Sequence, residues 1–342
     1  MREFLEQLID RRDLTEEEAA ALLVALSSEQ TPAAAAGGVL AALRAKGETA
    51  EEVRGFAKAM RRLALRPEIP GREGAVDVVG TGGDGSGSLN LSTGAALLAA
   101  ACGQPVIKHG NRAQSSRCGS ADVLEALGME LPPDGRAARQ WFEKTGFTFL
   151  FAPHFHPALR TLGPVRRSLG VPTVFNILGP LSNPVEPPFL LVGAFSAPAA
   201  ELIARALSGL PIRRAFVVHG ANGWDEPTPL GPFLLFDVTA GRVLAGRRDP
   251  AELGLPRRSA EELRGGDARE NARSLREALS GEPGAHADSL RLGAALAMEV
   301  TGLVATTGEG LDLASSAIAS GAASRLVERL TAGSTGDIEE HG

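Results

Sequence analysis

The sequence predicts an α/β protein in which a small helical domain precedes a larger domain with a central, mostly parallel sheet. Two observations carry this fold class. Residues 1–70 hold helix-start signals and no strand pattern, whereas from residue 75 onward short apolar strand-like runs alternate with helical runs. Pro67, Pro70 and Gly71 break the helices between these regions, so we expect domains of residues 1–70 and 71–342.

The N-terminal region shows three helix starts. Thr15 and Thr49 each open a capping box with a glutamate three residues later, and Thr31 precedes Pro32 in the typical order of an N-cap and a first helical residue. Gly47 is a plausible stop for the helix that Pro32 begins. Nothing in this region suggests chemistry, so we interpret it as a packing or oligomerisation module.

The second region should contain five strands, then a hairpin, with helices between them. We expect strands at 75–79, 105–109, 147–151, 190–195 and 215–219, and a hairpin at 233–238 and 242–244. We expect helices at 94–101, 121–127, 137–144, 157–169, 198–207, 287–299 and 311–330, followed by a polar tail. Ligands of such a domain gather at the carboxyl ends of the strands.

Composition narrows the classes of function. The chain of 342 residues has 44% hydrophobic residues, enough for a sizeable core, and its net charge of −6 argues against a general nucleic-acid binder. Cys102 and Cys118 are the only cysteines and lie outside any CxxC motif, which supports neither a disulfide framework nor a zinc site. No signal peptide opens the chain and no apolar run reaches membrane-spanning length, so we expect a cytoplasmic protein.

A glycine-rich loop is the strongest single signal. After the first strand come five glycines, at positions 80, 82, 83, 85 and 87, and then Asn90, Ser92 and Thr93 at a helix start. Glycines allow a ligand to approach the backbone closely, and the N–H groups of a helix start attract anions, so this pattern favours a phosphate site. It matches neither the Walker A nor the dinucleotide motif. Asp84 would repel phosphate unless it orients a loop, a hydroxyl or a metal.

Further polar groups follow the later strands. Lys108, His109, Asn111 and Arg112 end the second strand, and a polar loop of residues 115–120 comes next. Lysine suits phosphate, and its position one βα unit after the glycine loop suggests a shared site. On the following helix, Asp122 and Glu125 are three residues apart and fit a solvated or loop-bracing face.

Two other clusters allow both functional and structural interpretations. His154 and His156 lack a nearby third ligand, which favours helix capping over zinc binding. One of Arg160, Arg166 and Arg167 could meet a carboxylate ligand, although arginines on a helix are more often solvated.

The adjacent acids Asp225 and Glu226 follow the fifth strand. In a chain with a phosphate cradle they favour Mg²⁺ binding over acid–base work or a solvated turn.

Taken together, these blocks resemble the anthranilate phosphoribosyltransferase family of tryptophan biosynthesis. The matching segments occur in family order at residues 43–49, 80–84, 90–93, 108–112, 119–128, 174–181, 219–220 and 225–226. The resemblance implies the nucleoside phosphorylase/phosphoribosyltransferase class of fold, with a helical domain hinged to the α/β domain and the site in the cleft between them. It also implies that about residues 157–187 contribute to the helical domain, and that the protein is a homodimer joined through the helical domains.

The resemblance implies roles for individual residues. Those expected to hold 5-phosphoribosyl 1-pyrophosphate (PRPP) are Gly80, Thr81, Gly82, Gly83, Asp84, Ser88, Asn90, Ser92, Thr93, Lys108 and Ser120. Those expected to meet anthranilate are Gly80, His109, Asn111 and Arg166, with Arg166 on the carboxylate. Ser92, Asp225 and Glu226 would bind Mg²⁺, two ions per monomer. The product would be N-(5-phosphoribosyl)anthranilate. Because the aniline nitrogen is neutral and Mg²⁺-bound pyrophosphate leaves readily, no general acid or base is assigned.

Three positions depart from the family pattern, and two alternatives stay open. Leu89 stands in place of a frequent phenylalanine, Trp224 in place of a leucine, and Gly293 where an asparagine is expected. A pyrimidine-nucleoside phosphorylase would share the fold but would need neither the acid pair nor the glycine loop with Asp84. A non-catalytic relative that binds nucleic acid would need a basic surface, whereas this chain is acidic.

Overall fold

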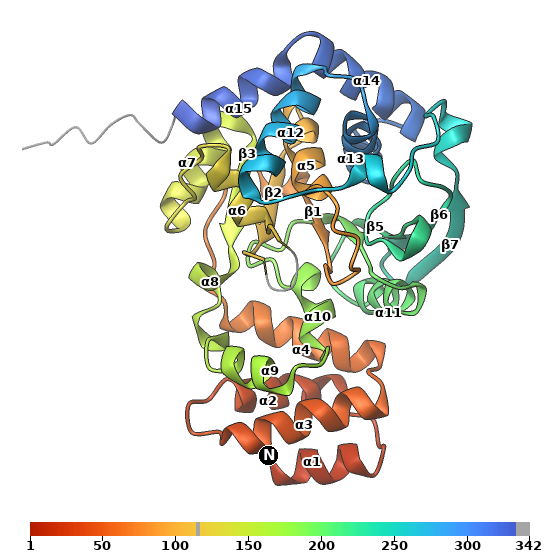
Figure 1. The fold of residues 1–342 in the computed structure, drawn as a ribbon. Helices are drawn as coiled ribbons and strands as arrows, with labels where there is room; N and C mark the ends of the chain where they lie inside the picture. The colour runs from red at the N-terminus through yellow and green to blue at the C-terminus, as the bar shows by residue number, and fades with distance from the viewer. Residues whose placement is uncertain (114–116, 333–342) are drawn as a thin grey trace, which may run out of the picture.

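The computed structural model describes residues 1–113 and 117–332 and arranges them as a helical part below a larger α/β part (Figure 1). The α/β part contains one seven-stranded sheet in the order β3-β2-β1-β4-β5-β6-β7. The first five strands are parallel, at Val76–Gly80, Val106–Gly110, Phe147–Phe151, Phe189–Gly193 and Arg214–His219. The hairpin of β6 (Phe233–Thr239) and β7 (Arg242–Arg248) continues the sheet in antiparallel fashion. The predicted fold class is therefore confirmed.

The helical part contains six helices, two of which come from a distant stretch of the chain. These are α1 (Arg2–Ile9), α2 (Glu16–Leu26), α3 (Ala33–Lys46) and α4 (Ala50–Leu63), with α9 (Leu162–Leu169) and α10 (Phe175–Leu178) beside them (Figure 1). The capping boxes predicted at Thr15 and Thr49 are both present. Apolar side chains of α9 and α10, among them Leu162 and Ile177, share one buried cluster with α2, α3 and α4.

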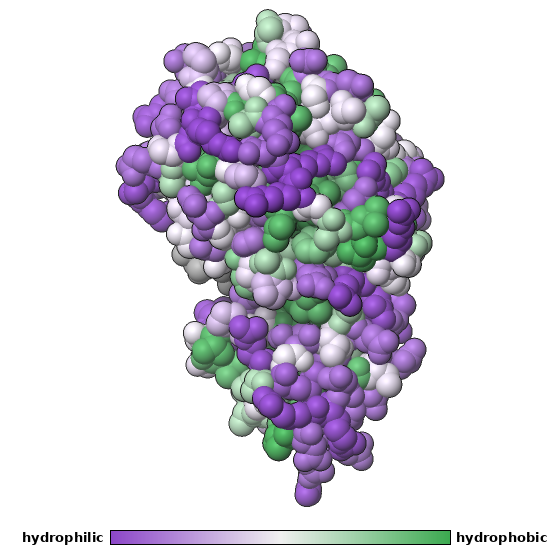
Figure 2. Space-filling view, turned by 90° about the vertical axis from the view of Figure 1, so that its right-hand side faces the viewer, coloured by the Kyte–Doolittle hydropathy of each residue, from purple (hydrophilic) through white to green (hydrophobic). Residues whose placement is uncertain are grey.

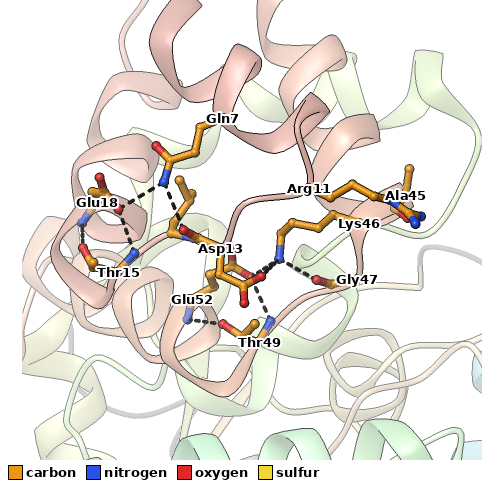
Figure 3. A network of polar contacts seen from close by, with 11 residues as sticks. Gln7, Arg11, Asp13, Thr15, Glu18, Ala45, Lys46, Gly47, Thr49 and Glu52 are labelled. Atoms are coloured by element: carbon orange, nitrogen blue, oxygen red, sulfur yellow. Dashed lines mark hydrogen bonds and ion pairs between the residues drawn. The ribbon is translucent and has the colours of Figure 1, made fainter.

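A buried ion pair joins α3 to α4 and holds the segment just before α2 (Figure 3). Glu52 is fully buried at the start of α4, where Lys46 Nζ donates to its Oε2 at 3.0 Å and to Asp13 Oδ1 at 2.7 Å. The backbone N–H of Leu14 donates to Glu52 Oε1 at 2.9 Å. Because both oxygens of this carboxylate accept hydrogen bonds, the buried charge is compensated and fixes how α2, α3 and α4 meet.

The two faces of the sheet pack against different partners. On one face Leu191, Phe216 and Val218 pack against α5 (Leu91–Ala101) and α13 (Ala285–Thr301). On the other face the alternate residues Leu190, Ala215 and Val217 share a cluster with α11 (Ala197–Ser208) and the helical part. This strict alternation is what a sheet covered on both sides requires. The cluster that contains Leu190, Ala215 and Val217 joins the helical part to the sheet through apolar contacts.

The remaining helices include two that the sequence analysis did not predict, as it did not predict α10, and two predicted helices had the wrong extent. α6 (Ser120–Ala126), α7 (Gly135–Thr145) and α8 (Ala152–Phe155) precede α9, and neither α8 nor α12 (Ala268–Ser280) was predicted. The helix predicted over 311–330 is wrong as a single unit. It is α14 (Thr307–Ala319) and α15 (Ala322–Ala332), separated by Gly321 with a left-handed φ of +74°. The helix predicted over 157–169 is a short 3₁₀ turn, Pro157–Leu159, followed by α9, because Pro164 fits only the first turn of a new helix.

The surface supports the division into two parts seen in the ribbon. Turned by 90°, the outline narrows on one side where the α/β part meets the helical part, and polar and apolar residues are interspersed over this face (Figure 2). Among the described residues no helix combines the length and the apolar character needed to cross a membrane. The polar tail predicted after residue 332 lies outside the described residues.

A pair of helix glycines tests how tightly α2 packs on α4. A Cβ atom at Gly55 would lie 2.2 Å from the Glu16 backbone oxygen, whereas at Gly37 it would come no nearer to a neighbour than 3.7 Å, at Leu169 Cδ2. We therefore expect Gly55→Ala to lower the free energy of unfolding by about 1–3 kcal/mol. Gly37→Ala should raise it by about 0.5–1 kcal/mol, because alanine favours a helix interior. Urea unfolding of both variants checks this, and equal effects at the two sites would contradict the packing.

Candidate active site

The glycine loop after β1, the polar residues at the end of β2 and the acidic turn after β5 lie together at the carboxyl ends of β1, β2, β4 and β5. The turn that carries Asp225 and Glu226 crosses directly over two strand ends, because glycines there leave room. A Cβ at Gly193, the last residue of β4, would lie 1.6 Å from the Asp225 backbone oxygen, and one at Gly80 would lie 2.4 Å from Asp225 Oδ2. Any side chain at Gly193 would displace the acid pair, so this glycine belongs to the architecture of the site.

Asp84 shapes the glycine loop. Its Oδ1 accepts hydrogen bonds from Ser86 N at 3.0 Å and from Ser86 Oγ at 2.9 Å. Its Oδ2 accepts from Asp225 N at 3.1 Å. The loop-orienting role that the sequence allowed for Asp84 is thus observed, and the same carboxylate joins the glycine loop to the acidic turn.

Both members of the acid pair accept hydrogen bonds from backbone N–H groups. Gly82 N donates to Asp225 Oδ2 at 2.6 Å, and Ser92 N, in the first turn of α5, donates to Glu226 Oε1 at 3.0 Å. A carboxylate at a helix N-terminus is stabilised by the unpaired N–H groups and the helix dipole. The predicted phosphate cradle and the predicted metal ligands therefore form one hydrogen-bonded unit.

Lys108 lies beneath this unit, in a gap between β1 and β2. These strands pair at Val76 and Val106. Beyond that point side chains bridge them: Lys108 Nζ donates to the Val78 oxygen, and Asp77 Oδ1 accepts from His109 N at 3.2 Å. Lys108 is almost fully buried, and its Nζ lies 3.5 Å from Ser92 Oγ. The ammonium thus reaches from the sheet to the start of α5.

Asn183 completes this buried polar bridge from the segment after α10. Its Nδ2 donates to Asp77 Oδ2 and to the Ile107 oxygen, both at 2.9 Å, and its Oδ1 accepts from Val185 N at 3.0 Å. Asp77, Lys108 and Asn183 are all buried. The sequence analysis gave neither Asp77 nor Asn183 a role, although a charged residue inside a buried strand was an available signal.

The charges in this cluster are unbalanced in a way that suits a divalent cation. Burial lowers the pKa of Lys108, whereas the nearby Asp77, Glu226 and Asp225 oppose that shift. Burial raises the pKa of Glu226 to about 7 and, together with the charges of Glu226 and Asp84, raises that of Asp225 well above its ordinary range. Two buried carboxyl groups, Asp77 and Asp225, and the half-buried Glu226 thus surround one buried ammonium, and bound Mg²⁺ would favour the charged forms of the acid pair.

The protein donor set for such an ion is small. The described residues contain no group of three or more His, Cys, Asp or Glu side chains arranged for a metal. Asp225 and Glu226 would supply two carboxylates, with the Ser92 residue bonded to Glu226, and further ligands would come from a substrate or from water. Mg²⁺ bound to substrate phosphates fits this pattern, whereas a structural zinc site does not.

His109 is the last residue but one of β2. Its ring lies edge-on to that of His156, with centroids 5.1 Å apart. Burial and the neighbouring His156 lower the pKa of His109 to about 3, and burial lowers that of His156 to about 4. Both rings are therefore neutral near pH 7, and His109 Nε2 is buried with no hydrogen-bond partner among the described residues. His156 was not among the predicted site residues.

The three arginines near α9 differ in their surroundings. Arg166 is half-buried, and its guanidinium lies 5.1 Å from the ring centroid of Phe175 at the start of α10. Burial lowers the pKa of Arg166. Arg160 and Arg167 are exposed. Arg166 is thus the arginine oriented toward the α10 segment, and α10 lies directly below the end of β1 (Figure 1).

The other predicted residues lie around the same strand ends. Ser120 Oγ donates to the Asn111 oxygen at 3.4 Å, and Asp122 Oδ2 accepts from Ala113 N and Gly119 N at 3.0 and 2.9 Å. Asp122 therefore braces the loop, as the sequence analysis allowed. Thr93 Oγ1 is buried without a partner among the described residues. Ser115 and Ser116 lie outside the described residues.

The residues that depart from the expected pattern are buried and packed. Leu89 belongs to the main core, and Trp224 packs with Leu263 and Ala285. A Cβ at Gly293 would lie 2.7 Å from Ala95 Cβ, so glycine lets α13 approach α5 closely. Gly293 also lines a small cavity of about 10 Å³ that Ser92 and Glu226 border. None of the three departures removes a candidate ligand.

Comparison with known families places both parts of the chain in one class of protein. Residues 72–324 match the glycosyl transferase family, a/b domain, and residues 2–64 match the glycosyl transferase family, helical bundle domain. The chain therefore has the two-domain organisation of this class of transferase.

Individual relatives narrow the class. The anthranilate phosphoribosyltransferase of Desulforudis audaxviator is 44% identical over 331 residues, which cover 96% of this chain and 95% of that protein. The crystal structure of anthranilate phosphoribosyltransferase from Thermus thermophilus superimposes with a TM-score of 0.90 at 44% identity, covering 96% of this chain and 98% of that one. This chain belongs to the anthranilate phosphoribosyltransferase family.

A more distant member has been solved with ligands. The anthranilate phosphoribosyltransferase of Saccharomyces cerevisiae in complex with PRPP and Mg is 27% identical and superimposes with a TM-score of 0.88, covering 97% of this chain and 96% of that one. The same yeast enzyme has been solved in complex with 4-fluoroanthranilate, with a TM-score of 0.85.

The buried bridge between Asp77 and Asn183 gives a pH-dependent prediction. Burial raises the pKa of Asp77 to about 6 against an ordinary 3.8. Stability from this group is therefore complete below about pH 4 and is lost as the pH rises through 6. Asn183→Leu removes a donor to the carboxylate and raises its pKa further. We expect a loss of about 1.5–3 kcal/mol in the free energy of unfolding at pH 8 and a smaller loss at pH 5.

Urea unfolding at the two pH values checks this, and Gln104→Leu is the matched control. Gln104 is also a buried amide, but its partners are the Gly74 oxygen and the Thr301 hydroxyl, which do not titrate in this range. The control should therefore lose the same stability at pH 5 and pH 8. An equal loss at both pH values for Asn183→Leu would contradict a charged Asp77.

Proposed function

We propose that this protein transfers the phosphoribosyl group of PRPP to the amine of anthranilate, giving N-(5-phosphoribosyl)anthranilate and pyrophosphate, as in tryptophan biosynthesis. The observation that carries the proposal is the acid pair, with Asp225 buried and Glu226 half-buried, held by backbone N–H groups of the glycine loop and of α5 above a buried lysine. Such a site has the charge and the donors for a magnesium pyrophosphate group. A nucleoside phosphorylase that uses inorganic phosphate would not need the acid pair.

PRPP would bind along the glycine loop and the start of α5. The loop would hold the pyrophosphate through residues 80–84, and the remaining contacts would come from Ser88, Asn90, Ser92, Thr93, Lys108 and Ser120. Lys108 supplies a fixed positive charge beneath the loop, since its side chain is already held against β1 and needs no rearrangement. The helix N-terminus adds further N–H donors for an anionic group.

Asp225, Glu226 and the Ser92 hydroxyl would hold Mg²⁺, and we propose two ions per monomer. When bound, Mg²⁺ stabilises the negative charge that develops on departing pyrophosphate. The raised pKa of Glu226, about 7, supports this assignment, because a divalent cation would favour the carboxylate form that burial disfavours. The protein contributes the orientation of the two carboxylates through Gly82, Ser92 and Asp84.

Anthranilate would enter from the side of α9 and α10, where His109, Asn111 and the backbone at Gly80 would contact it and Arg166 would pair with its carboxylate. A neutral His109 is suited to hydrogen bonding and carries no charge that would oppose Arg166. The C1–oxygen bond to pyrophosphate breaks, the C1–nitrogen bond forms, and the amine then releases a proton to solvent. An aniline nitrogen is a neutral nucleophile at pH 7, so orientation of the reactants is the main requirement.

We also propose that the helical domain comprises residues 1–70 together with about 157–187, that residues 71–342 form the α/β domain, and that two chains associate through the helical domains. The exposed apolar side chains Ile9 on α1 and Val24 on α2, which are 64% and 47% exposed, support such an association. Solution scattering would test the dimer.

The acid pair gives the most direct mutational test of the function. Wild-type protein should consume anthranilate, followed by its fluorescence, only when both PRPP and Mg²⁺ are present. Asp225→Asn with Glu226→Gln should lower turnover about a hundredfold or more, since the metal ligands are lost. The control Glu277→Gln with Glu282→Gln removes two exposed acids and should leave turnover unchanged. Normal Mg²⁺-dependent turnover in the first double variant would exclude the metal assignment.

The arginines near α9 test the carboxylate assignment. Losing a charge-assisted hydrogen bond costs about 1.5–3 kcal/mol, or roughly ten- to a hundredfold in affinity. Arg166→Ala should raise the KM for anthranilate by that factor and change the KM for PRPP little. The exposed Arg160 and Arg167 serve as controls, and their alanine variants should behave like wild type. A selective rise in either control, with none in Arg166→Ala, would show that the wrong arginine was assigned.

A further inference from the structure

Residues 263–271, which we call the brace, lie along the second half of the glycine loop. Gly265 N donates to the Gly87 oxygen at 2.8 Å, and Leu89 N donates to the Leu263 oxygen at 3.1 Å. Between these bonds Ser88 and Arg264 form an antiparallel bridge. The second half of the loop is therefore paired as in a short piece of sheet.

The brace also holds the side chain of Asn90. Asn271, the last residue of the brace, is 2% exposed on α12, and its Nδ2 donates to Asn90 Oδ1 at 2.9 Å. Its own Oδ1 accepts from Gly266 N at 2.6 Å. Asn90 Nδ2 in turn donates to the Cys118 oxygen at 3.1 Å. An asparagine amide has two N–H groups and two acceptor positions, so these bonds fix Asn90 and leave it one donor and one acceptor for a ligand.

The brace is itself anchored in the α/β part. Leu263 is fully buried and packs with Trp224, which stands directly before the acid pair, and with Ala285 of α13. Just before the brace, Arg258 Nε donates to Asp288 Oδ2 at 2.9 Å. Trp224 therefore connects the acidic turn to the same segment that supports the glycine loop.

We propose that the brace, with Asn271 as its main side chain, positions Asn90 and the Gly87–Leu89 backbone to bind the phosphoribosyl end of PRPP. This inference rests on the proposed function. A glycine-rich loop loses conformational entropy when it closes on a ligand, and a loop that is already paired loses less. Asn271 is a positioning residue, since it acts through Asn90 and not on the reacting atoms. Weakening the brace should reduce PRPP affinity and leave anthranilate affinity unchanged.

Two independent variants weaken the brace. Asn271→Leu removes both hydrogen bonds with little change in volume. Gly265→Ala adds a Cβ that would lie 2.5 Å from the Ser88 oxygen and so pushes the loop strand away. The controls are Gly74→Ala, where no atom lies within 4 Å of the added Cβ, and Arg273→Ala, an exposed position on the same helix as Asn271. All four are compared with wild type by steady-state kinetics and by calorimetric titration with PRPP and Mg²⁺.

We expect both brace variants to raise the KM and the calorimetric Kd for PRPP about tenfold, with the KM for anthranilate within twofold of wild type and both controls normal. Circular dichroism verifies folding. If Asn271→Leu does not fold, Gly265→Ala and the milder Asn271→Asp decide the question. Unchanged PRPP affinity in the brace variants, or an equal rise in the KM values for PRPP and anthranilate, would contradict the proposed positioning role of the brace. Wild-type protein without turnover would instead refute the proposed function, so the two failures are distinguishable.

Discussion

The site depends on one constraint, which is that a buried lysine and three carboxyl groups lie close together where adjacent strands end, with Asp77 and Asp225 buried and Glu226 half-buried. Lys108 can remain there because Asp77, Glu226 and Asp225 counter the cost of removing its charge from water. The strands separate after Val76 to admit these groups, and Asn183 bridges the gap. Burial raises the pKa of all three acids, and a bound divalent cation would favour their charged forms.

The architecture around this cluster fixes its geometry in advance. Backbone N–H groups from two separate elements hold the acid pair, and glycines at the ends of β1 and β4 admit it. Asn183 belongs to the segment that follows α9 and α10, so the buried cluster is bonded directly to the chain that carries Arg166. The residues proposed to bind PRPP and those proposed to bind anthranilate are therefore held by the same buried cluster of Asp77, Lys108 and Asn183. Catalysis would then come from the orientation of the substrates and from charge stabilisation.

The sequence predicted the parts of this arrangement that follow local rules. The capping boxes at Thr15 and Thr49, the strand before the glycine loop and the parallel α/β class were all readable from pattern and are confirmed. The long-range bonds were not, because nothing near Asn183 in sequence shows that its amide meets Asp77, 106 residues away. Helix α12 was not predicted because its many charged residues obscure the spacing of its apolar residues in the sequence. Its capping box at Asp267 and Glu270 was an available signal. Gly321 divides α14 from α15, and a C-terminal glycine stop within the predicted helix could have indicated this.

The most direct test of the account is a calorimetric titration of the wild-type protein with PRPP, in the presence and absence of Mg²⁺. If the acid pair and Lys108 form a magnesium pyrophosphate site, PRPP binds once per chain, and removing Mg²⁺ weakens binding at least about tenfold, which corresponds to about 1.4 kcal/mol. Binding of equal strength without Mg²⁺, or no binding of PRPP at all, would contradict it.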